Sequence, residues 1–334
     1  MSTEAGDPVL VTGGSGFLGG ALLERLVGEG RDVRALARSP EAAAAVERLG
    51  ARPVPGDVLD PASLRAATRG CETVFHLAGL GTICRRDPRP LLRTNVDGST
   101  NVVRAAAFEG VRRLIHTSSG AAIGEAKGTV GREDTPHRGS YLSVYERSKY
   151  LAERRVLALG AELDLDVVCV NPSSVQGPGR TSGSATLLIR LMSGRLPVAI
   201  DTTVSVVDVD DCAEGHRLAE TRAVRGERYL LSAAALTIGD AVELVRGIAG
   251  RPKRVRFVSG WVALVAASAV ELGASALRRD APFCMDAART LVHGHRYDGS
   301  RAARELGLVY TPIEETLRRT LTWYAERGLV PAPT

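Results

Sequence analysis

The chain is short of the residues that metal-binding, secreted and membrane-spanning proteins need. Five cysteines occur, at Cys71, Cys84, Cys169, Cys212 and Cys284. They have no paired spacing of the kind that holds zinc, and the histidines are scattered, so we expect reduced thiols and no metal site. Residues 1–8 lack the basic and apolar regions of a signal peptide, which together with reduced thiols favours a cytoplasmic protein.

A long apolar run and a concentrated basic patch are also missing. The most apolar stretch, Trp261 to Leu277, contains Glu271 and falls short of the ~20 residues that cross a bilayer. We expect it to form a helix over a substrate pocket, with peripheral membrane contact as the alternative. The net charge is +5 and the arginines are scattered, so nucleic acid is not expected as a partner. The arginine-rich stretch 85–93 forms either a solvated face or a binding site for an anionic substrate.

What is present begins with a strand, a glycine turn and a helix. The run Pro8 to Thr12 has the length and β-branched bias of a buried strand, and apolar residues recur at helical spacing from Phe17 onward. Between them lies Gly13-x-x-Gly16-x-x-Gly19, where side chains would block a tight turn and the approach of phosphate. The start of the helix would then face a dinucleotide pyrophosphate. The expected contacts are Gly13, Ser15, Gly16, Phe17 and Leu18.

Strands and helices alternate along the rest of the first half. Strands are expected at 32–37, 53–55, 73–77, 114–116 and 166–170, and helices at 42–49, 95–108 and 145–159. This pattern predicts an α/β fold, a Rossmann-type doubly wound parallel sheet with ligands beyond the carboxyl ends of its strands, and a smaller, mostly helical C-terminal substrate lobe. We assign residues 1–175 and about 201–236 to the dinucleotide-binding domain, with 201–218 and 229–231 returning to the main sheet. The lobe then comprises about 176–200 and 237–334.

The end of the second strand indicates which dinucleotide binds. NAD sites usually place Asp or Glu there to hold the ribose 2′-hydroxyl, whereas this chain has Leu-Ala-Arg-Ser at 36–39. The guanidinium of Arg38 suits a 2′-phosphate, so we predict NADP(H). NAD(H) is the alternative if Arg38 is only a solvated side chain. Asp57 and Val58 follow the third strand, where Asp57 either meets the adenine amino group or caps a turn.

The predicted reacting group is a tyrosine. Tyr145 and Lys149 are four residues apart in a helical run, so their side chains share one face. An ammonium beside a phenol favours the phenolate and lowers its pKa from about 10 toward working pH. Lysine is rare in this chain, which makes its occurrence at this position informative.

Hydroxyl groups follow the strand at 114–116. In Thr117-Ser118-Ser119, one of the two serines should bond the substrate oxygen beside Tyr145, and Ser119 is preferred over Ser118. Asn95, at the start of a helix, either holds a water for proton relay or caps that helix.

As a set, these motifs resemble the extended short-chain dehydrogenase/reductases, or NAD-dependent epimerase/dehydratase superfamily. The branch they resemble is the dihydroflavonol-reductase-like one, which includes hopanoid-associated sugar epimerases. The likeness lies in 12–19, 56–57, 76–79, 95–98, 117–119, 145–153, 171–172 and 209–216. It implies Ser119, Tyr145 and Lys149 as catalytic residues and a homodimer. It also implies cofactor contacts from Leu77, Ala78, Gly79, Asn95, Thr117, Tyr145, Lys149, Pro172 and Ser173.

Three functions are open at this stage. The first is an NADP(H)-dependent oxidoreductase for the ketone, aldehyde or secondary alcohol of a small, partly apolar substrate, with Tyr145 as general acid/base. The second is an NAD-dependent nucleotide-sugar epimerase or dehydratase, or a 3β-hydroxysteroid-dehydrogenase-like enzyme. Sugar-nucleotide epimerases usually have Arg-Tyr-x-Asn where this chain has Val-Cys-Val-Asn at 168–171, which argues against a nucleotide sugar. The third is a non-catalytic dinucleotide sensor, which the intact Tyr145 and Lys149 argue against.

Overall fold

A seven-stranded parallel sheet forms the centre of the protein, which a computed structural model describes over residues 8–249 and 255–331. Its strands run in the order β10-β6-β5-β4-β1-β2-β3. They are β1 (Val9–Thr12), β2 (Val33–Ala37), β3 (Arg52–Pro55), β4 (Thr73–His76), β5 (Arg113–Thr117), β6 (Asp166–Pro172) and β10 (Arg228–Leu231). The chain order reverses between β1 and β4, so the ligand crevice is expected at the carboxyl ends of these strands.

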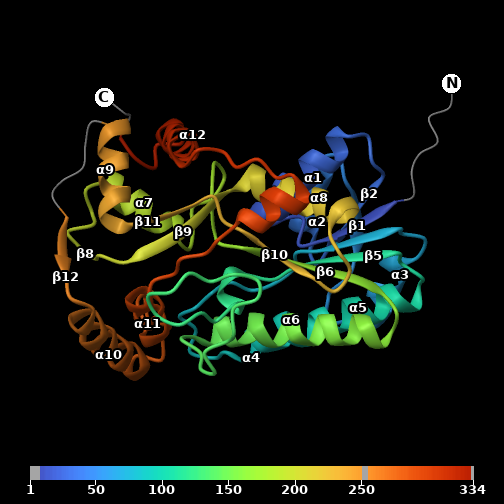
Figure 1. Ribbon diagram of the computed structural model, residues 1–334, viewed down its shortest axis with the longest axis horizontal. Helices are drawn as coiled ribbons and strands as arrows, with labels where there is room; N and C mark the ends of the chain where they lie inside the picture. The colour runs from blue at the N-terminus through green and yellow to red at the C-terminus, as the bar shows by residue number, and fades with distance from the viewer. Residues whose placement is uncertain (1–7, 250–254, 332–334) are drawn as a thin grey trace.

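Helices cover both faces of this sheet (Figure 1). One face carries α1 (Phe17–Gly28), α2 (Pro40–Glu47) and α8 (Val209–Arg222), and the other carries α3 (Pro61–Thr68), α5 (Ser99–Phe108) and α6 (Val144–Glu162). Alternate strand residues supply the two cores. In β1, Val9 and Val11 pack with the leucines of α1, whereas Leu10 packs with the valines of α5. Every residue of β1 is therefore buried, as expected for a strand covered on both faces.

The later part of the chain adds a smaller lobe with its own core. Two small sheets, β11-β9-β7 and β12-β8, lie in this part. Their strands are β7 (Ser174–Gln176), β8 (Val198–Ile200), β9 (Thr203–Asp208), β11 (Ala234–Thr237) and β12 (Arg256–Val258). The helices are α7 (Ala185–Met192), α9 (Ile238–Ala249), α10 (Gly260–Ala276), α11 (Met285–His293) and α12 (Ile313–Glu326). A cluster of buried side chains from α7, α9, α12 and β9 forms the core of the lobe.

The predicted sheet and its strands are confirmed, but two expectations about neighbouring segments are wrong. Within 201–218, α8 covers the main sheet, and Val207 of β9 reaches the same core although β9 is not a strand of that sheet. β9 pairs instead with β7 and β11, because β10 occupies the sheet edge beside β6. The helix expected at 95–108 also starts earlier: α4 (Arg89–Leu92) runs into a π-helical turn, Arg93–Gly98, before α5 begins. Asn95 is thus inside the helical segment, so it does not cap its start.

The apolar stretch 261–277 forms α10, as expected, at the lower left of Figure 1. Only Ala263 and Ala267 are buried in this helix, whereas Trp261, Val265 and Leu272 are exposed. Within 8–249 and 255–331, no helix is long and apolar enough to cross a membrane. Residues 1–7, on which the expectation about a signal peptide depends, lie outside the described residues.

Candidate active site

The turn between β1 and α1 allows a close approach of backbone to ligand. Gly13 has a φ of +76°, and a β-carbon there would lie 2.7 Å from the backbone nitrogen of Ala78. A β-carbon on Gly19 would lie 2.1 Å from the carbonyl oxygen of Gly13, so neither position accommodates a side chain. Gly16 begins α1 without a side-chain cap, and the first turn carries no acidic residue. The helix N-terminus is therefore open to an anion and fits a dinucleotide pyrophosphate.

Arg180 lies near both this turn and Tyr145, although the sequence did not single it out. Its guanidinium carbon is 5.7 Å from the centre of the Phe17 ring, and its Nη1 donates a 2.6 Å hydrogen bond to the backbone oxygen of Val175. The hydroxyl of Tyr324 donates a 2.9 Å hydrogen bond to the backbone oxygen of Arg180. The residue sits in the irregular segment between β7 and α7, where no periodic pattern guides prediction. The guanidinium of Arg180 therefore connects the segment after β7 with the start of α1.

The residues after β2 and β3 differ in whether their side chains are already engaged in hydrogen bonds. Arg38 is exposed, and within the described part of the chain its side chain has no hydrogen bond or ion pair. Ser39 caps α2, since its Oγ accepts a 3.3 Å hydrogen bond from the backbone N–H of Ala42. Asp57 Oδ1 accepts a 2.9 Å hydrogen bond from the backbone N–H of Leu59, which is the turn role considered for it. Of these three side chains, that of Arg38 is therefore the one left free at the ends of β2 and β3.

Asn95 holds the loop that follows β4. Its Oδ1 accepts a 2.7 Å hydrogen bond from the backbone N–H of Leu80, and its Nδ2 donates a 3.0 Å bond to the oxygen of the same residue. Nδ2 also lies 2.9 Å from Ser148 Oγ, on α6. A β-carbon on Gly79 would lie 3.2 Å from Asn95 Oδ1 and 3.4 Å from Lys149 Nζ. Asn95 therefore fixes the backbone beside Lys149.

A buried chain of hydrogen bonds runs from this loop into the sheet. The Ala78 N–H donates to Thr12 Oγ1, which donates to His76 Nδ1 over 2.7 Å. His76 Nε2 donates to Ser99 Oγ over 2.9 Å, and that hydroxyl donates to the backbone oxygen of Asn95. This order of donors requires the neutral His76 tautomer with its proton on Nε2. Burial, assisted by the charge of Lys149, lowers the pKa of His76 to about 3 and keeps the ring neutral.

Lys149 is buried and tied to the end of β5. Its Nζ donates a 2.9 Å hydrogen bond to the carbonyl oxygen of Thr117. Burial lowers the pKa of Lys149 to about 8, although Glu153, one helical turn further, acts in the opposite direction. Glu153 is itself held by Asn171 and by Arg228, whose Nη1 is 2.9 Å from Glu153 Oε1. The lysine thus occupies a fixed position at the carboxyl edge of the sheet.

Tyr145 lies one helical turn before Lys149 and is half-buried. Burial raises the pKa of Tyr145, while a hydrogen bond with the Ser119 side chain and the charge of Arg180 lower it. The prediction that Lys149 makes Tyr145 more acidic stays a prediction, since Lys149 is not among the groups that shift the pKa of Tyr145 in this arrangement. The lysine ammonium bonds Thr117, and the cation that acts on Tyr145 is Arg180.

Two further hydroxyls gather at the ends of β5 and β6. Ser118 Oγ and Ser173 Oγ are buried and have no hydrogen-bond partner among the described residues. Ser173 directly follows Pro172, the last residue of β6, and β6 pairs with β5. Buried hydroxyls without partners are rare, so this edge is suited to a polar ligand.

A cavity of about 370 Å³ opens beside Val144, the residue before Tyr145. Apolar side chains of the loop after β4 line it together with charged groups, and the C-terminal part of α10 contributes Glu271, Ala274 and Ser275. The helix at 261–277 therefore contributes to a pocket, although much of its surface is exposed. In the stretch 85–93, all four arginines are exposed, and Arg85 and Arg86 line the cavity.

A disulfide joins Cys84, in the loop after β4, to Cys284, directly before α11. Their Cα atoms are 5.4 Å apart, although 200 residues separate them in the chain. The expectation of reduced thiols is therefore wrong for this pair, because chain separation says nothing about distance in the fold. Both residues line the 370 Å³ cavity. The remaining cysteines, Cys71, Cys169 and Cys212, are free and buried.

Comparison with known proteins gives consistent matches over this architecture. The NAD dependent epimerase/dehydratase family model matches residues 9–232. A protein of Synechocystis sp. named "Putative dihydroflavonol 4-reductase" is 32% identical over 333 residues, covering 97% of this chain and 96% of that protein. Sterol demethylase protein B of Methylococcus capsulatus is 32% identical over 326 residues, covering 96% and 99%. The crystal structure of gox2253 superposes with a TM-score of 0.85 at 31% identity, covering 97% and 99%.

Proposed function

The chain belongs to the NAD dependent epimerase/dehydratase family, that of the extended short-chain dehydrogenase/reductases, and we propose that it is an NADP(H)-dependent oxidoreductase. It reduces the ketone or aldehyde of a small, partly apolar substrate, or oxidises the corresponding secondary alcohol. Membership of the family establishes an NAD(P)-dependent enzyme on a Rossmann-like fold. The observation that carries the finer proposal is the contact of Tyr145 with Ser119, beside a partly apolar cavity. The relative named as a reductase supports the direction of the chemistry.

In this proposal Tyr145 is the general acid/base. When bound, the reduced nicotinamide supplies a hydride to the carbonyl carbon. Tyr145 gives its hydroxyl proton to the carbonyl oxygen, and Ser119 donates a hydrogen bond that stabilises the charge on that oxygen. The raised pKa of Tyr145 suits the reducing direction, because the hydroxyl carries its proton at neutral pH.

The cofactor is assigned to the edge formed by β1, β2 and β4. The open N-terminus of α1 holds the pyrophosphate, and the exposed guanidinium of Arg38 holds the 2′-phosphate of NADP(H). Lys149 and Asn95 define the nicotinamide end through the Thr117 oxygen and the Leu80 backbone. In the domain division that accompanies this assignment, residues 1–175 with 201–236 bind the cofactor, and 176–200 with 237–334 bind the substrate.

The substrate is assigned to the cavity beside Val144. Ile83, Pro88 and Leu91 supply apolar surface there. Three arginines supply positive charge and two carboxylates supply negative charge: Arg85, Arg86, Arg279, Glu271 and Asp286. This mixture favours a molecule with an apolar body and a polar or anionic end. We include in the proposal a homodimer, which light scattering of the purified protein tests. We also include a cytoplasmic location, although the Cys84–Cys284 disulfide removes reduced thiols as an argument for it.

The test is a screen of NADPH oxidation by the purified enzyme. The substrates are ketosteroids, flavonoid-like ketones, aldehydes and keto-sugars, with each product identified by mass spectrometry. We expect NADPH consumption that matches formation of the alcohol one for one for at least one class. Tightly retained NAD together with isomerised nucleotide sugar, and no net NADPH oxidation, would instead establish an epimerase.

A further inference from the structure

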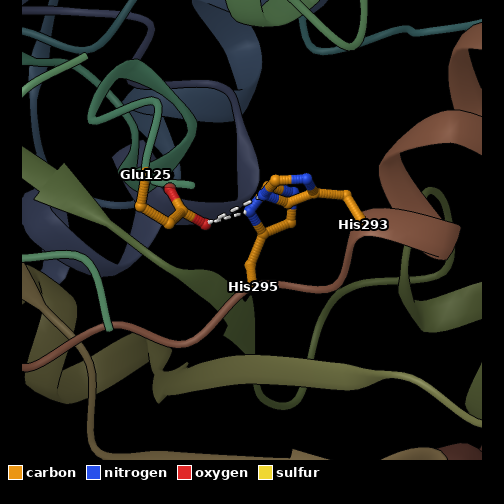
Figure 2. Close-up of side chains that lie close together, drawn as sticks. All are labelled: Glu125, His293 and His295. Carbon is orange, nitrogen blue, oxygen red and sulfur yellow. Dashed lines mark hydrogen bonds and ion pairs between the residues drawn. The ribbon is translucent and has the colours of Figure 1, made fainter. Parts of the chain in front are cut away.

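Three metal-ligand side chains from distant parts of the chain converge outside the proposed reacting centre. Glu125 comes from the loop after β5, and His293 and His295 come from the end of α11 and the segment beyond it (Figure 2). Glu125 Oε1 is 2.6 Å from His295 Nδ1 and 3.8 Å from His293 Nε2. One ligand atom of each residue lies within 4.8 Å of the other two.

The hydrogen bond between Glu125 and His295 leaves two buried atoms of this cluster without a partner among the described residues. Glu125 Oε2 and His293 Nε2 have no hydrogen-bond partner among the described residues. Their side chains are only 1% and 6% exposed, so water does not solvate them freely. A buried carboxylate is costly unless it is paired, and His295 alone engages one of its two oxygens. A cation between the three side chains would satisfy both remaining atoms.

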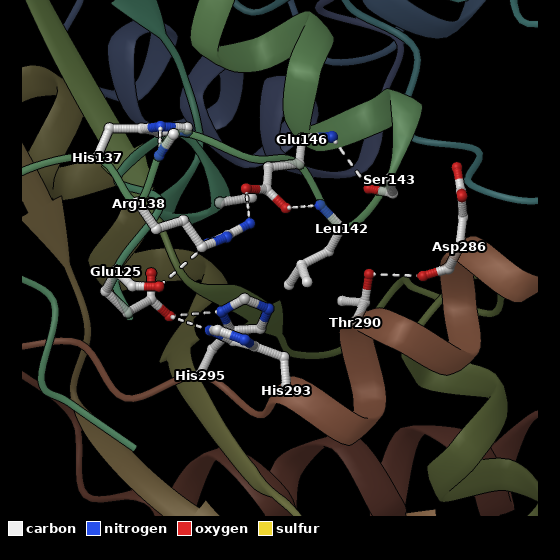
Figure 3. Close-up of polar contacts among 12 residues, drawn as sticks. Glu125, His137, Arg138, Leu142, Ser143, Glu146, Asp286, Thr290, His293 and His295 are labelled. Carbon is white, nitrogen blue, oxygen red and sulfur yellow. Dashed lines mark hydrogen bonds and ion pairs between the residues drawn. The ribbon is translucent and has the colours of Figure 1, made fainter. Parts of the chain in front are cut away.

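The nearby guanidinium does not fill this role. Arg138 is paired with the Glu146 carboxylate, and its Nη1 donates a 3.1 Å hydrogen bond to the backbone oxygen of Glu125 (Figure 3). Arg138 therefore leaves Glu125 Oε2 and His293 Nε2 without a hydrogen-bond partner among the described residues.

We propose that Glu125, His293 and His295 bind a divalent transition-metal ion of the Zn²⁺ class. Two imidazole nitrogens and one carboxylate oxygen are a donor set that zinc prefers. Ligands about 2.0–2.2 Å from a tetrahedral zinc are roughly 3.4 Å from each other. The 2.6 and 3.8 Å separations bracket that value, and all three ligand atoms lie within 4.8 Å of one another, so side-chain rotations complete the site. The Tyr297 hydroxyl, 3.0 Å from His295 Nδ1, is placed to be the fourth ligand.

The position of the site indicates a structural role. A β-carbon on Gly120, the residue after Ser119, would lie 2.7 Å from the Tyr297 ring, so the loop and this tyrosine are in close contact. A metal bound to Glu125 and His295 would fasten the loop that carries Ser119 to the segment that carries Tyr297. The ion would thus stabilise one wall of the site without taking part in proton transfer.

The test uses tag-free full-length protein stripped with EDTA and then dialysed. Titration with Zn²⁺ is followed by calorimetry, and Co²⁺ by its visible absorption, whose intensity and position report tetrahedral nitrogen and oxygen ligation. We expect one equivalent of either metal per chain and a higher melting temperature with Zn²⁺. The wild-type Co²⁺ spectrum needs no variant, so a folding defect in a mutant does not affect it.

Variants then locate the site. Glu125→Gln and His293→Gln remove a ligand and should weaken Zn²⁺ binding by more than the roughly 10-fold that loss of an outer partner costs. His137→Gln is the matched control, because this nearby histidine stacks on Tyr150 at 4.2 Å and is outside the ligand set. The proposal is overturned if the wild type binds no stoichiometric metal, or if both ligand variants bind it as tightly as the control. Neither result depends on the proposed oxidoreductase activity.

Discussion

The ammonium of Lys149 donates a 2.9 Å hydrogen bond to the carbonyl oxygen of Thr117, which ties α6 to the end of β5. Its partner in the predicted motif, Tyr145, instead lies beside the Ser119 side chain and is influenced by the charge of Arg180. The two residues of the Tyr-x-x-x-Lys motif thus have separate electrostatic environments. Lys149 holds a position at the sheet edge, and Tyr145 carries the proton in the proposed reaction.

These separate environments predict which residue controls the fall in activity at alkaline pH. Burial sets the pKa of Lys149 to about 8, whereas the pKa of Tyr145 is raised above its usual value. As pH rises through 8, Lys149 loses its charge and kcat/KM for carbonyl reduction should fall while Tyr145 is still protonated. In Lys149→Arg the side chain stays charged, so this fall should move to higher pH. An unchanged fall in that variant, measured from pH–rate profiles, would assign it to another group.

The glycine turn predicts a contrast between two glycines of α1. Gly19→Ala places a β-carbon 2.1 Å from a backbone oxygen, and the clash should cost at least the about 1–3 kcal/mol typical of overpacking. Gly28→Ala is the matched control, because no atom lies within 4 Å of its β-carbon position. Denaturation midpoints and NADPH binding should fall in the first variant only. Equal behaviour of both variants would contradict the close approach at Gly19.

Arg38 should determine the preference for NADPH over NADH. Arg38→Glu removes the cation and repels a 2′-phosphate, so kcat/KM with NADPH should fall roughly 10- to 100-fold, as for loss of a hydrogen bond to a charged group. Arg48→Glu, at an exposed arginine following α2, makes the same charge change and should leave the ratio of NADPH to NADH unchanged. A wild-type enzyme without preference, or equal effects of both substitutions, would remove Arg38 from the cofactor site.

Reduction of the Cys84–Cys284 disulfide should make the folded protein less stable. The bond closes a loop of 200 residues, and its loss should lower the free energy of unfolding by about 2–4 kcal/mol. Denaturation with and without a phosphine reductant measures this. The Cys84→Ala/Cys284→Ala variant is the control and should not respond to the reductant. Thiol titration of unreduced, denatured wild type should find three thiols; five would contradict the bond.

Much of the fold could be predicted because most strands of the main sheet are buried on both faces, the edge strand β3 being the exception. Segments such as Val9–Thr12 therefore appear in the sequence as short apolar runs between helical patterns. The pairing of β9 could not be predicted, since edge and small-sheet strands lack that signal and depend on which edge is free. The π-helical turn at Arg93–Gly98 was hidden for a similar reason, because hydrophobic spacing does not distinguish it from α-helix.

The residues of the proposed site also fall into two groups, those that the sequence indicated and those that only the structure shows. Local motifs located Gly13, Arg38, Tyr145 and Lys149, because their chemistry depends on spacing within one turn or helix. Contacts between distant segments left no local trace. The Cys84–Cys284 bond, the approach of Arg180 to Tyr145 and the meeting of Glu125 with His295 all depend on tertiary packing. Spacing alone predicted no metal site for the same reason.

The most direct test of the account is the turnover of Tyr145→Phe with the best carbonyl substrate found in the NADPH screen. Phenylalanine keeps the ring and removes only the hydroxyl, so NADPH binding and melting temperature should be unchanged while kcat falls by about 10²–10⁴-fold, the usual contribution of a general acid. Wild-type turnover in this variant, with NADPH still bound, would contradict the central claim that Tyr145 gives its proton to the substrate oxygen.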